Sequence, residues 1–478
     1  MNSVTAKVSP TVTIVGGGLA GLAAAVGLAS AGCQVELFES RRSLGGRAAS
    51  FRDPTSGELV DHCLHVSMGC CTNLADFCRR TGIAEFFRHD RVLHFIAPDQ
   101  KQYRMAATSW LPAPLHLVPA FLSLGYLSIG ERFRIARAMW KLMRDPLADD
   151  AKGSTAGQWL REHGQSPNAI ERFWSVVLVS ALGEELDRAS MSAARKVLVD
   201  GFLAARDAYV VEIPETPLGT LYGERLEGWL LARGVKLRLN APIRQVTWDG
   251  MPVVVQPDGQ ELRSDFVVIA VPWSKITDIV SAEIADQWPW LDEMRSLDAA
   301  PITGIHLWFD RKIMSLPHAV LVGRLSQWIF ARPTEAPAEH YYQVVISASR
   351  GLAGRNRDEI ACEVHRELSA IWPEARAARL LRARVVTEHG AVFSVRPGLD
   401  LLRPAQETSL PGVVLAGDWT STGWPATMEG AVRSGYLAAE SVLRSVGRDE
   451  HILMPDLSRG LLARLLIKTR SERVTSNR

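Results

Sequence analysis

The chain has 478 residues, of which 47% are hydrophobic and 22% charged, with a formal net charge of +2. This composition is that of an ordinary globular protein and excludes a disordered chain. The near-neutral charge offers no argument for nucleic acid as a partner. At this length two domains are expected rather than a single core.

The cysteines and the N-terminus indicate the compartment. Four of the six cysteines lie between residues 63 and 78. The adjacent pair Cys70-Cys71 does not fit a zinc-binding spacing, so we expect no metal site. Buried thiols in a reducing compartment are the favoured interpretation. Residues 1–10 lack an apolar core and do not resemble a secretory signal, which predicts a cytoplasmic protein.

Residues 11–39 (TVTIVGGGLAGLAAAVGLASAGCQVELFE) predict a strand, a glycine turn, a helix and a second strand. The β-branched run 11–15 is typical of a buried parallel strand. An alanine-rich helix follows to about Ala31 and ends at Gly32. Such a strand–turn–helix unit begins a dinucleotide-binding α/β domain.

Its turn fits G-x-G-x-x-G at Gly16, Gly18 and Gly21. Gly16 permits the tight turn, Gly18 lets the backbone approach a pyrophosphate, and Gly21 allows close helix–strand packing. Ala20 is a further small residue of the same turn and is expected to contact the cofactor. Glu39 ends the second strand, where its carboxylate can accept hydrogen bonds from ribose hydroxyls and would repel the 2′-phosphate of NADP. We therefore predict a dinucleotide site, although a purely structural turn is the alternative.

The residues after Glu39 decide which dinucleotide is expected. Arg41, Gly46 and Arg47 complete the pattern E-x-R-x-x-x-G-G-R. This pattern resembles the second flavin fingerprint of the family that contains flavin amine oxidases, protoporphyrinogen oxidases and phytoene desaturases. The resemblance implies that Arg41 and Arg47 support the diphosphate and ribose of FAD.

A third motif, AGDWTSTGWPATMEGAVRSG, occupies residues 416–435. A strand delivers Gly417 and Asp418, whose carboxylate can accept from ribityl or ribose hydroxyls. Met428, Glu429 and Ala431 then open a helix whose N–H groups can stabilise negative charge on the flavin. The string resembles the FAD-closing segment of plant-type phytoene desaturases. Since no cysteine lies near it, we expect FAD to be bound non-covalently.

The resemblance implies a mixed α/β fold, with a Rossmann-like FAD-binding domain and an interleaved substrate domain of antiparallel sheet and helices. We assign residues 1–100, 210–272 and 396–447 to the first, 101–209 and 273–395 to the second, and 448–478 to a basic tail. Residues 154–203 and 221–233 are expected to be helical. Four strands, at 235–239, 243–247, 251–256 and 261–269, are expected to form one meander. Val246 matches the family valine that meets the adenine, or is simply a core residue.

Residues 59–66 (LVDHCLHV) correspond to the family segment that runs past the flavin ring. Asp61, His62 and His65 are therefore candidates for proton transfer there. The alternative is that all three side chains form hydrogen bonds with the backbone of a buried turn.

Two segments predict contact with a membrane surface. Residues 110–130 carry no charge, but Pro112, Pro114 and Pro119 would break a spanning helix. Residues 131–144 form a cationic amphipathic helix, and residues 457–478 are a second candidate. Packing in the core and a solvated terminus are the respective alternatives. We expect peripheral association with the inner leaflet of the cytoplasmic membrane.

Longer strings narrow the family. VDHCLHVSMGCCTNLADFCRRTGI, LPAPLHLVPAFL and GDWTSTGWPATMEGAVRSG together resemble bacterial hydroxysqualene dehydroxylases. The resemblance implies reductive removal of a hydroxyl from a long isoprenoid to give squalene for hopanoid synthesis, with a separate electron donor for FAD. A carotenoid desaturase is the alternative enzyme, and a non-catalytic prenyl-lipid binding protein is a second alternative. An amine oxidase is less favoured, because Trp424 lacks an obvious tyrosine partner.

Overall fold

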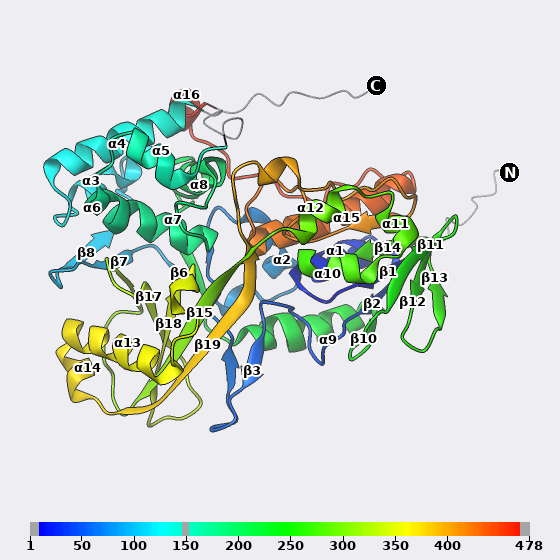
Figure 1. Cartoon of the computed structure of the whole chain (residues 1–478), viewed down its shortest axis with the longest axis horizontal. Helices are drawn as coiled ribbons and strands as arrows, with labels where there is room; N and C mark the ends of the chain where they lie inside the picture. The colour runs from blue at the N-terminus through cyan, green and yellow to red at the C-terminus, as the bar shows by residue number, and fades with distance from the viewer. Residues whose placement is uncertain (1–8, 146–152, 469–478) are drawn as a thin grey trace.

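The computed structural model describes residues 9–145 and 153–468 of the chain. Its first layer is a parallel five-stranded sheet in the order β10-β2-β1-β14-β20 (Figure 1). These strands span Lys236–Arg238, Gln34–Phe38, Thr11–Val15, Phe266–Ile269 and Val413–Leu415. Segments far apart in the sequence thus meet in one sheet. The predicted α/β fold class is confirmed.

Two helices pack together against this sheet: α1 (Leu19–Ser30) and α15 (Met428–Ser445). Their contact is backbone-close at Gly435, where a Cβ would lie 2.2 Å from the carbonyl oxygen of Ala20. Every α1 residue from Leu19 to Leu28 is buried. Because α1 and α15 interlock through small residues, the first and third sequence motifs are brought to the same end of the sheet.

The predicted four-stranded meander is partly wrong. Only β11 (Gln245–Trp248), β12 (Pro252–Val255) and β13 (Glu261–Arg263) form the antiparallel sheet. β10 and β14, which flank them, belong to the parallel sheet instead. The break between β13 and β14 falls at Asp265, whose carboxylate accepts from the N–H and the hydroxyl of Thr11. Alternation within the strands could not reveal that the outer two pair with distant partners.

A seven-stranded sheet in the order β19-β15-β18-β17-β16-β7-β8 forms the second layer. All its neighbouring strands are antiparallel except β16 and β7. Helix α13 (Arg357–Ile371) covers one face over a buried apolar cluster. The strands in this order span Leu380–Phe393, Ala299–Phe309, His340–Ile346, Trp328–Arg332, His318–Leu321, Leu93–Ile96 and Gln102–Met105. The predicted domain boundary at residue 100 falls inside the β7–β8 hairpin, and the domain division otherwise stays a prediction.

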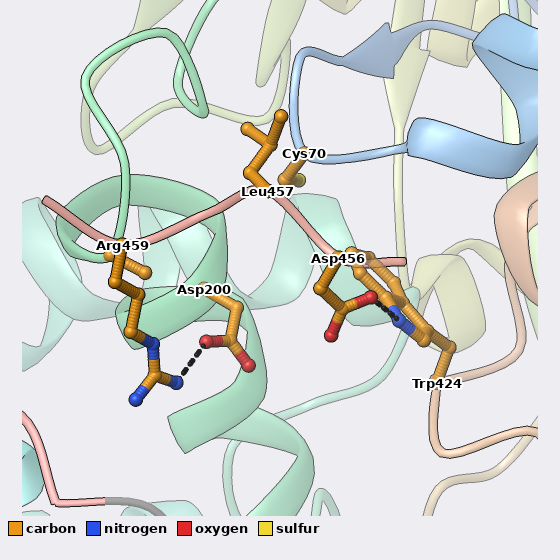
Figure 2. Close-up of a pocket in the computed structure, with 7 residues that line it drawn as sticks. Cys70, Asp200, Trp424, Asp456, Leu457 and Arg459 are labelled. Atoms are coloured by element: carbon orange, nitrogen blue, oxygen red, sulfur yellow. Dashed lines mark hydrogen bonds and ion pairs between the residues drawn. The ribbon is translucent and has the colours of Figure 1, made fainter. Parts of the chain in front are cut away.

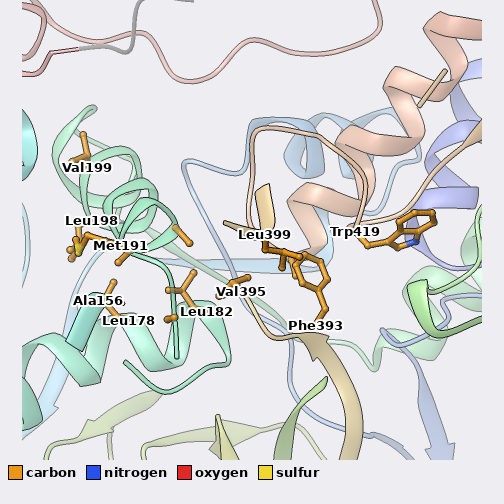
Figure 3. Packing of buried hydrophobic residues seen from close by; sticks show 14 of the residues in the cluster. Ala156, Leu178, Leu182, Met191, Leu198, Val199, Phe393, Val395, Leu399 and Trp419 are labelled. Carbon is orange, nitrogen blue, oxygen red and sulfur yellow. The ribbon is translucent and has the colours of Figure 1, made fainter. Parts of the chain in front are cut away.

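The expected helical region 154–203 is a set of short helices rather than one element. It holds α5 (Ala156–Glu162), α6 (Pro167–Ala169), α7 (Ser175–Leu182) and α8 (Met191–Leu198), with π-helical turns at Ile170–Trp174 and Val199–Leu203. Together with α3 (Val118–Leu122) and α4 (Ile129–Arg144), these helices surround a large apolar core. Figure 3 shows part of that core, from Leu178 and Leu182 on α7 toward Phe393 at the end of β19.

Two small sheets and the remaining helices connect the layers. The small sheets pair β3 with β4 and join β5, β9 and β6. These strands span Ser50–Arg52, Leu59–Asp61, Ser67–Met68, Val211–Pro214 and Phe87–Asp90. The remaining helices are α2 (Thr72–Arg80), α9 (Leu226–Leu231), α10 (Trp273–Ile279), α11 (Ala282–Ala285), α12 (Trp290–Arg295), α14 (Pro373–Ala377) and α16 (Leu461–Leu466). The helix predicted at 221–233 is confirmed as a π-helical turn, Gly219–Arg225, continued by α9.

Candidate active site

The turn between β1 and α1 has the backbone geometry that its glycines predict. Gly16 has φ +112°, and a Cβ there would lie 2.5 Å from the Ala270 carbonyl oxygen. A Cβ on Gly21 would lie 1.9 Å from the Gly16 oxygen. Gly18 is the N-cap of α1 and offers no side chain to the first-turn N–H groups, which include that of Ala20. An uncapped helix N-terminus of this kind suits a phosphate group.

A second glycine pair closes on the first. The N–H of Gly45 donates to Gly17 O (2.9 Å), and Gly46 has φ +63°. A Cβ on Gly46 would lie only 2.9 Å from the Cα of Gly18. Arg41 folds back, and its Nη1 donates to Gly46 O (3.3 Å). The two glycine motifs therefore form one backbone cradle that side chains would fill.

Glu39 is buried at the end of β2 and holds this cradle together. Its Oε2 accepts from the N–H of Gly17 (2.7 Å) and its Oε1 from the N–H of Arg41 (2.8 Å). A carboxylate can accept about four hydrogen bonds, so capacity for a ribose hydroxyl remains. The carboxylate thus lies where the sequence places it, beside the uncapped helix N-terminus.

Arg47 and Asp418 join the second motif to the third. Arg47 Nη2 lies 2.6 Å from Asp418 Oδ1, and its Nη1 donates to the carbonyl of Ala391 at the end of β19 (2.9 Å). Asp418 is buried and follows Gly417, whose N–H donates to the Ser434 hydroxyl (2.8 Å). Charge-assisted bonds of this length are strong. The contact with Ala391, which the sequence analysis missed, brings the seven-stranded sheet to the cofactor site.

The start of α15 differs in part from its predicted role. Thr427 is the N-cap: its hydroxyl accepts from the N–H of Gly430, and its carbonyl from that of Ala431. The N–H of Ala431 is therefore occupied within the helix. Only the N–H groups of Met428 and Glu429, in the first turn, remain for a cofactor.

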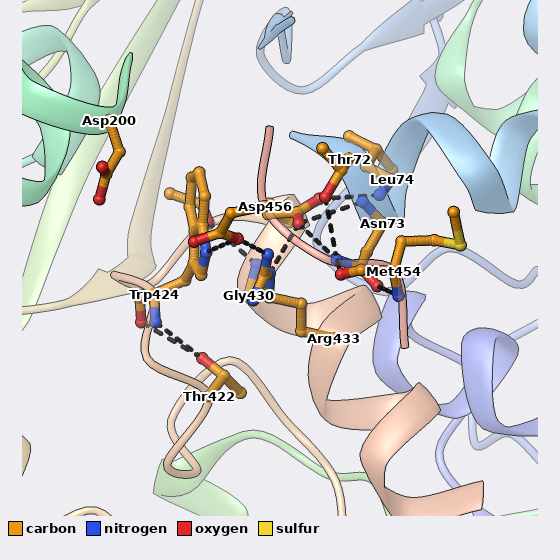
Figure 4. Close-up of polar contacts among 12 residues, drawn as sticks. Thr72, Asn73, Leu74, Asp200, Thr422, Trp424, Gly430, Arg433, Met454 and Asp456 are labelled. Carbon is orange, nitrogen blue, oxygen red and sulfur yellow. Dashed lines mark hydrogen bonds and ion pairs between the residues drawn. The ribbon is translucent and has the colours of Figure 1, made fainter. Parts of the chain in front are cut away.

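The Glu429 side chain is directed toward α2. Its carboxylate accepts from the N–H groups of Asn73 (3.2 Å) and Leu74 (2.8 Å) and lies 2.7 Å from Arg433 Nε. Figure 4 shows this network, which continues from Arg433 to Asp456 in the C-terminal segment. The Glu429 carboxylate therefore caps α2 and ties it to the first turn of α15, so its side chain is engaged by protein groups.

Val246 on β11 is fully buried. Its carbonyl accepts from the N–H of Ser281 (2.9 Å), and its side chain belongs to the main apolar core. The predicted contact with the adenine stays a prediction.

The three candidate acids have different surroundings. Asp61 is buried, and its Oδ1 accepts from the Ser50 hydroxyl and the Leu218 N–H (2.7 Å each). Its Oδ2 faces Arg332 Nη2 at 3.2 Å. Both oxygens thus act as acceptors for structural donors, which suits a structural anchor and not a proton donor.

The two histidines keep ring nitrogens for proton transfer. His65 is hydrogen-bonded through Nδ1 to the carbonyl of Cys63 (2.9 Å), which leaves Nε2. Burial lowers the pKa of His65, and Arg47 nearby adds to this effect. His62 lies edge-on to Phe51, and burial lowers its pKa as well. The Arg47 charge acting on His65 indicates that this ring is close to the cofactor cradle.

A small pocket borders the third motif. It has a volume of about 40 Å³ and is lined by Cys70, Asp200, Trp424, Asp456 and Arg459, among others (Figure 2). Trp424 donates from Nε1 to Asp456 (3.3 Å).

No group of acidic, histidine or cysteine side chains in the described residues could hold a metal ion.

The fold and this cradle define a class, the flavin-dependent α/β oxidoreductases. An uncapped helix N-terminus, two facing glycine motifs and two buried carboxylates fit the phosphates and hydroxyls of FAD. The chain belongs to the family of flavin-containing amine oxidoreductases, whose model matches residues 19–443. The prediction of FAD as cofactor is confirmed, and non-covalent attachment stays a prediction.

Named relatives are similar over nearly the whole chain. The 15-cis-phytoene desaturase of Solanum lycopersicum is 26% identical over 92% of this chain and 79% of its own length. The zeta-carotene desaturase of a Synechocystis strain is 25% identical over 91% and 98%, respectively. Among solved structures, a putrescine oxidase (TM-score 0.68, 16% identity) covers 91% of this chain and 99% of its own. Cyclohexylamine oxidase from Brevibacterium oxydans has the same TM-score at 17% identity and covers 92% and 100%. The two structures support the fold alone.

Proposed function

We propose that the protein removes the hydroxyl of hydroxysqualene reductively to give squalene, at the surface of a membrane. The observation that carries this proposal is the pair His62 and His65 beside the cofactor cradle. Removing hydrogen from a hydrocarbon polyene requires no acid, whereas an allylic hydroxyl leaves only when it is protonated.

The reaction balances as hydroxysqualene plus reduced flavin giving squalene, water and oxidised flavin. Bound reduced FAD supplies hydride chemistry at the flavin ring. The chain must supply a proton to the leaving oxygen, an apolar environment that excludes water, and fixed positions for both partners. A separate electron donor then restores the reduced cofactor.

The histidines predict a pH dependence for this step. Burial lowers the pKa of both rings below the ordinary 6.5, so each is mostly neutral at pH 7. A ring that acts as the acid must first take up a proton. Turnover should therefore rise as the pH falls through the lowered histidine pKa, and a flat profile between pH 7 and 5 would contradict a histidine acid.

Alanine substitutions identify the acid. Replacing the histidine that acts as the acid, by His65→Ala or by His62→Ala, should abolish squalene formation and leave FAD bound. Asp61→Asn should instead lower stability, because Arg332 loses its buried partner. Unchanged turnover in both histidine variants would contradict the proposal.

Carotenoid-type desaturation is the second candidate, and the named relatives favour it. Two of them are desaturases of carotenoid chains, by their names, at 25–26% identity. This activity would use a similar apolar cavity and the same cofactor but run hydride transfer in the opposite direction. A phytoene substrate that reduces the oxidised flavoprotein would establish it. A prenyl-lipid binding protein without chemistry would give neither reaction.

The membrane part of the proposal is supported by exposed apolar side chains on α4. Ile129, Phe133 and Trp140 are 81%, 71% and 47% exposed and follow one helical stripe, with Ala136 between them. Leu142 and the rest of the opposite face pack in the core, so α4 has two apolar faces.

Helix α16 extends the same surface. Leu461 and Leu465 are 82% and 72% exposed, and Leu465 O accepts from Arg144 at the end of α4 (3.2 Å). Figure 1 places α3, α4 and α16 along one edge. In the part of the chain that is described, no helix combines the length and apolarity needed to cross a bilayer. Basic side chains around this surface, such as Arg137, complement anionic lipid headgroups. The predicted tail beyond residue 468 lies outside the described residues.

A further inference from the structure

One face of the seven-stranded sheet carries a row of polar side chains that sequence motifs do not mark. The register pairs His306 on β15 with Gln343 on β18, and Gln343 with Phe330 on β17. Directly paired residues project from the same face of a sheet. The adjacent positions Ile305 and Val344 pack in the cluster that α13 covers. The row therefore lies on the opposite face.

The polar atoms of Gln343 are buried without partners. Gln343 and His306 are both 0% exposed. Neither Oε1 nor Nε2 of Gln343 has a hydrogen-bond partner among the described residues, whereas the His306 ring faces the backbone of His62 and the hydroxyl of Tyr341. An unsatisfied buried polar group costs roughly 1–3 kcal/mol, so native proteins almost always supply a partner. Missing partners at both polar atoms of one side chain point to a bound polar group.

The row faces the loop of the candidate acids. Gly304 precedes His306 on the same face, and a Cβ there would lie 2.8 Å from His62 O and 3.4 Å from Gln343 Nε2. Cys63 packs on the same glycine. The absence of a side chain at residue 304 thus lets the loop that carries His62 and His65 lie directly against Gln343.

The row is electrically neutral at its centre. His306 Nδ1 is hydrogen-bonded to the hydroxyl of Tyr341 (2.7 Å). Burial lowers the pKa of His306 to about 3, and burial raises the pKa of Tyr341. Both side chains are therefore uncharged at neutral pH. The Gln343 amide offers both a donor and an acceptor, which match a hydroxyl better than an ion.

We propose that the Gln343 amide binds the hydroxyl group of the isoprenoid substrate and holds it beside the His62–His65 loop. This inference rests on the proposed function and adds the side chain by which the site would distinguish hydroxysqualene from squalene. A hydroxyl at this position could belong to the substrate or to an ordered water, and the two sources predict different binding results.

The test uses the oxidised, FAD-loaded protein, which cannot reduce hydroxysqualene. Binding of hydroxysqualene and of squalene is measured from the change in flavin absorbance for wild type and Gln343→Leu. Gln327→Leu is the matched control, since Gln327 exchanges two hydrogen bonds with the Ser347 backbone. Thermal unfolding of all three proteins is recorded without ligand.

Wild type and the control should bind hydroxysqualene roughly tenfold more tightly than squalene, as one or two net hydrogen bonds provide. Gln343→Leu should lose that preference and bind squalene unchanged. Without ligand, its melting temperature should be no lower than that of wild type, and about one degree higher if no water fills the free site. The melting temperature of Gln327→Leu should be lower than that of wild type.

Three results overturn the assignment. Retained preference in Gln343→Leu means that water, and not substrate, occupies the site. A stability loss as large as that of Gln327→Leu means that the amide has protein partners after all. Absence of any preference in wild type overturns the proposed function itself, and this assignment with it. If Gln343→Leu does not fold, Gln343→Met, which keeps the length of the side chain and removes both polar atoms, is tested in the same way.

Discussion

The carboxylate of Glu429 should be a main support of helix α15, and Glu429→Gln tests this. The carboxylate is 1% exposed and accepts from two N–H groups at the start of α2, whose own N-cap, Cys71, provides no side-chain cap. It also neutralises Arg433, which is 8% exposed along its side chain. Glutamine keeps the shape, removes the charge and turns an NH₂ group toward existing donors.

The expected cost follows from these contacts. Hydrogen bonds to a charged group contribute about 1.5–3 kcal/mol each, and breaking a buried ion pair from one side costs about 3–5 kcal/mol. Arg433 keeps Asp456 as a second partner, and the contacts of Glu429 share one carboxylate and do not add, so we expect a loss of about 2–4 kcal/mol in the free energy of unfolding. Flavin retention should fall as well, since Glu429 lies in the first turn of α15.

Urea unfolding followed by circular dichroism, together with flavin fluorescence, measures both effects. Glu407→Gln is the control: Glu407 pairs with Arg444 on the same helix, but both side chains are about 60% exposed. That variant should change stability by less than about 1 kcal/mol. If Glu429→Gln also stays within about 1 kcal/mol of wild type, the supporting role assigned to Glu429 is refuted.

Three further predictions follow. Asp418→Asn should fold but retain FAD roughly tenfold less well, since it removes the charged partner of Arg47; equilibrium dialysis measures this, and unchanged retention would count against the cradle. Burial opposes ionisation of Glu131, but hydrogen bonds from Ser166 and its other neighbours outweigh it and bring the pKa to about 2 from 4.5. Because the folded pKa is depressed, this stabilisation, at most about 3 kcal/mol, is fully present above pH 4.5 and lost as the pH falls through about 2; the stabilities of wild type and Glu131→Gln should therefore differ above pH 4.5 and converge only near pH 2. Replacing Phe133 and Trp140 together by serine should weaken binding to anionic lipid vesicles at least tenfold in sedimentation and leave the melting temperature unchanged, whereas equal binding would remove the case for α4 as a docking surface.

Much of the cofactor site could be predicted because its determinants are local. The positive φ values of Gly16 and Gly46 arise from the local geometry of their turns. Glu39 directly follows a strand whose apolar pattern can be recognised in the sequence. Asp418 could be placed for the same reason. The pairing of Asp418 with Arg47 joins two such local motifs, and the family resemblance already implied that they meet.

The rest depended on contacts between distant segments. β10 and β14 look like meander strands locally, and only their parallel partners assign them elsewhere. The role of Glu429 depends on α2, and the anchoring of Asp61 depends on Arg332. The row around Gln343 depends on strand register, which alternation of residue types does not define between distant strands. A polar residue in a buried strand is the only sequence signal for such a site.

The central claim is tested most directly under anaerobic conditions. The purified flavoprotein is reduced with dithionite, hydroxysqualene is added in detergent, and flavin absorbance is followed together with extracted squalene. The proposed function predicts one squalene for each flavin reoxidised. Reduced flavin that persists with hydroxysqualene, together with oxidised flavin that phytoene reduces, would contradict it and establish a desaturase instead.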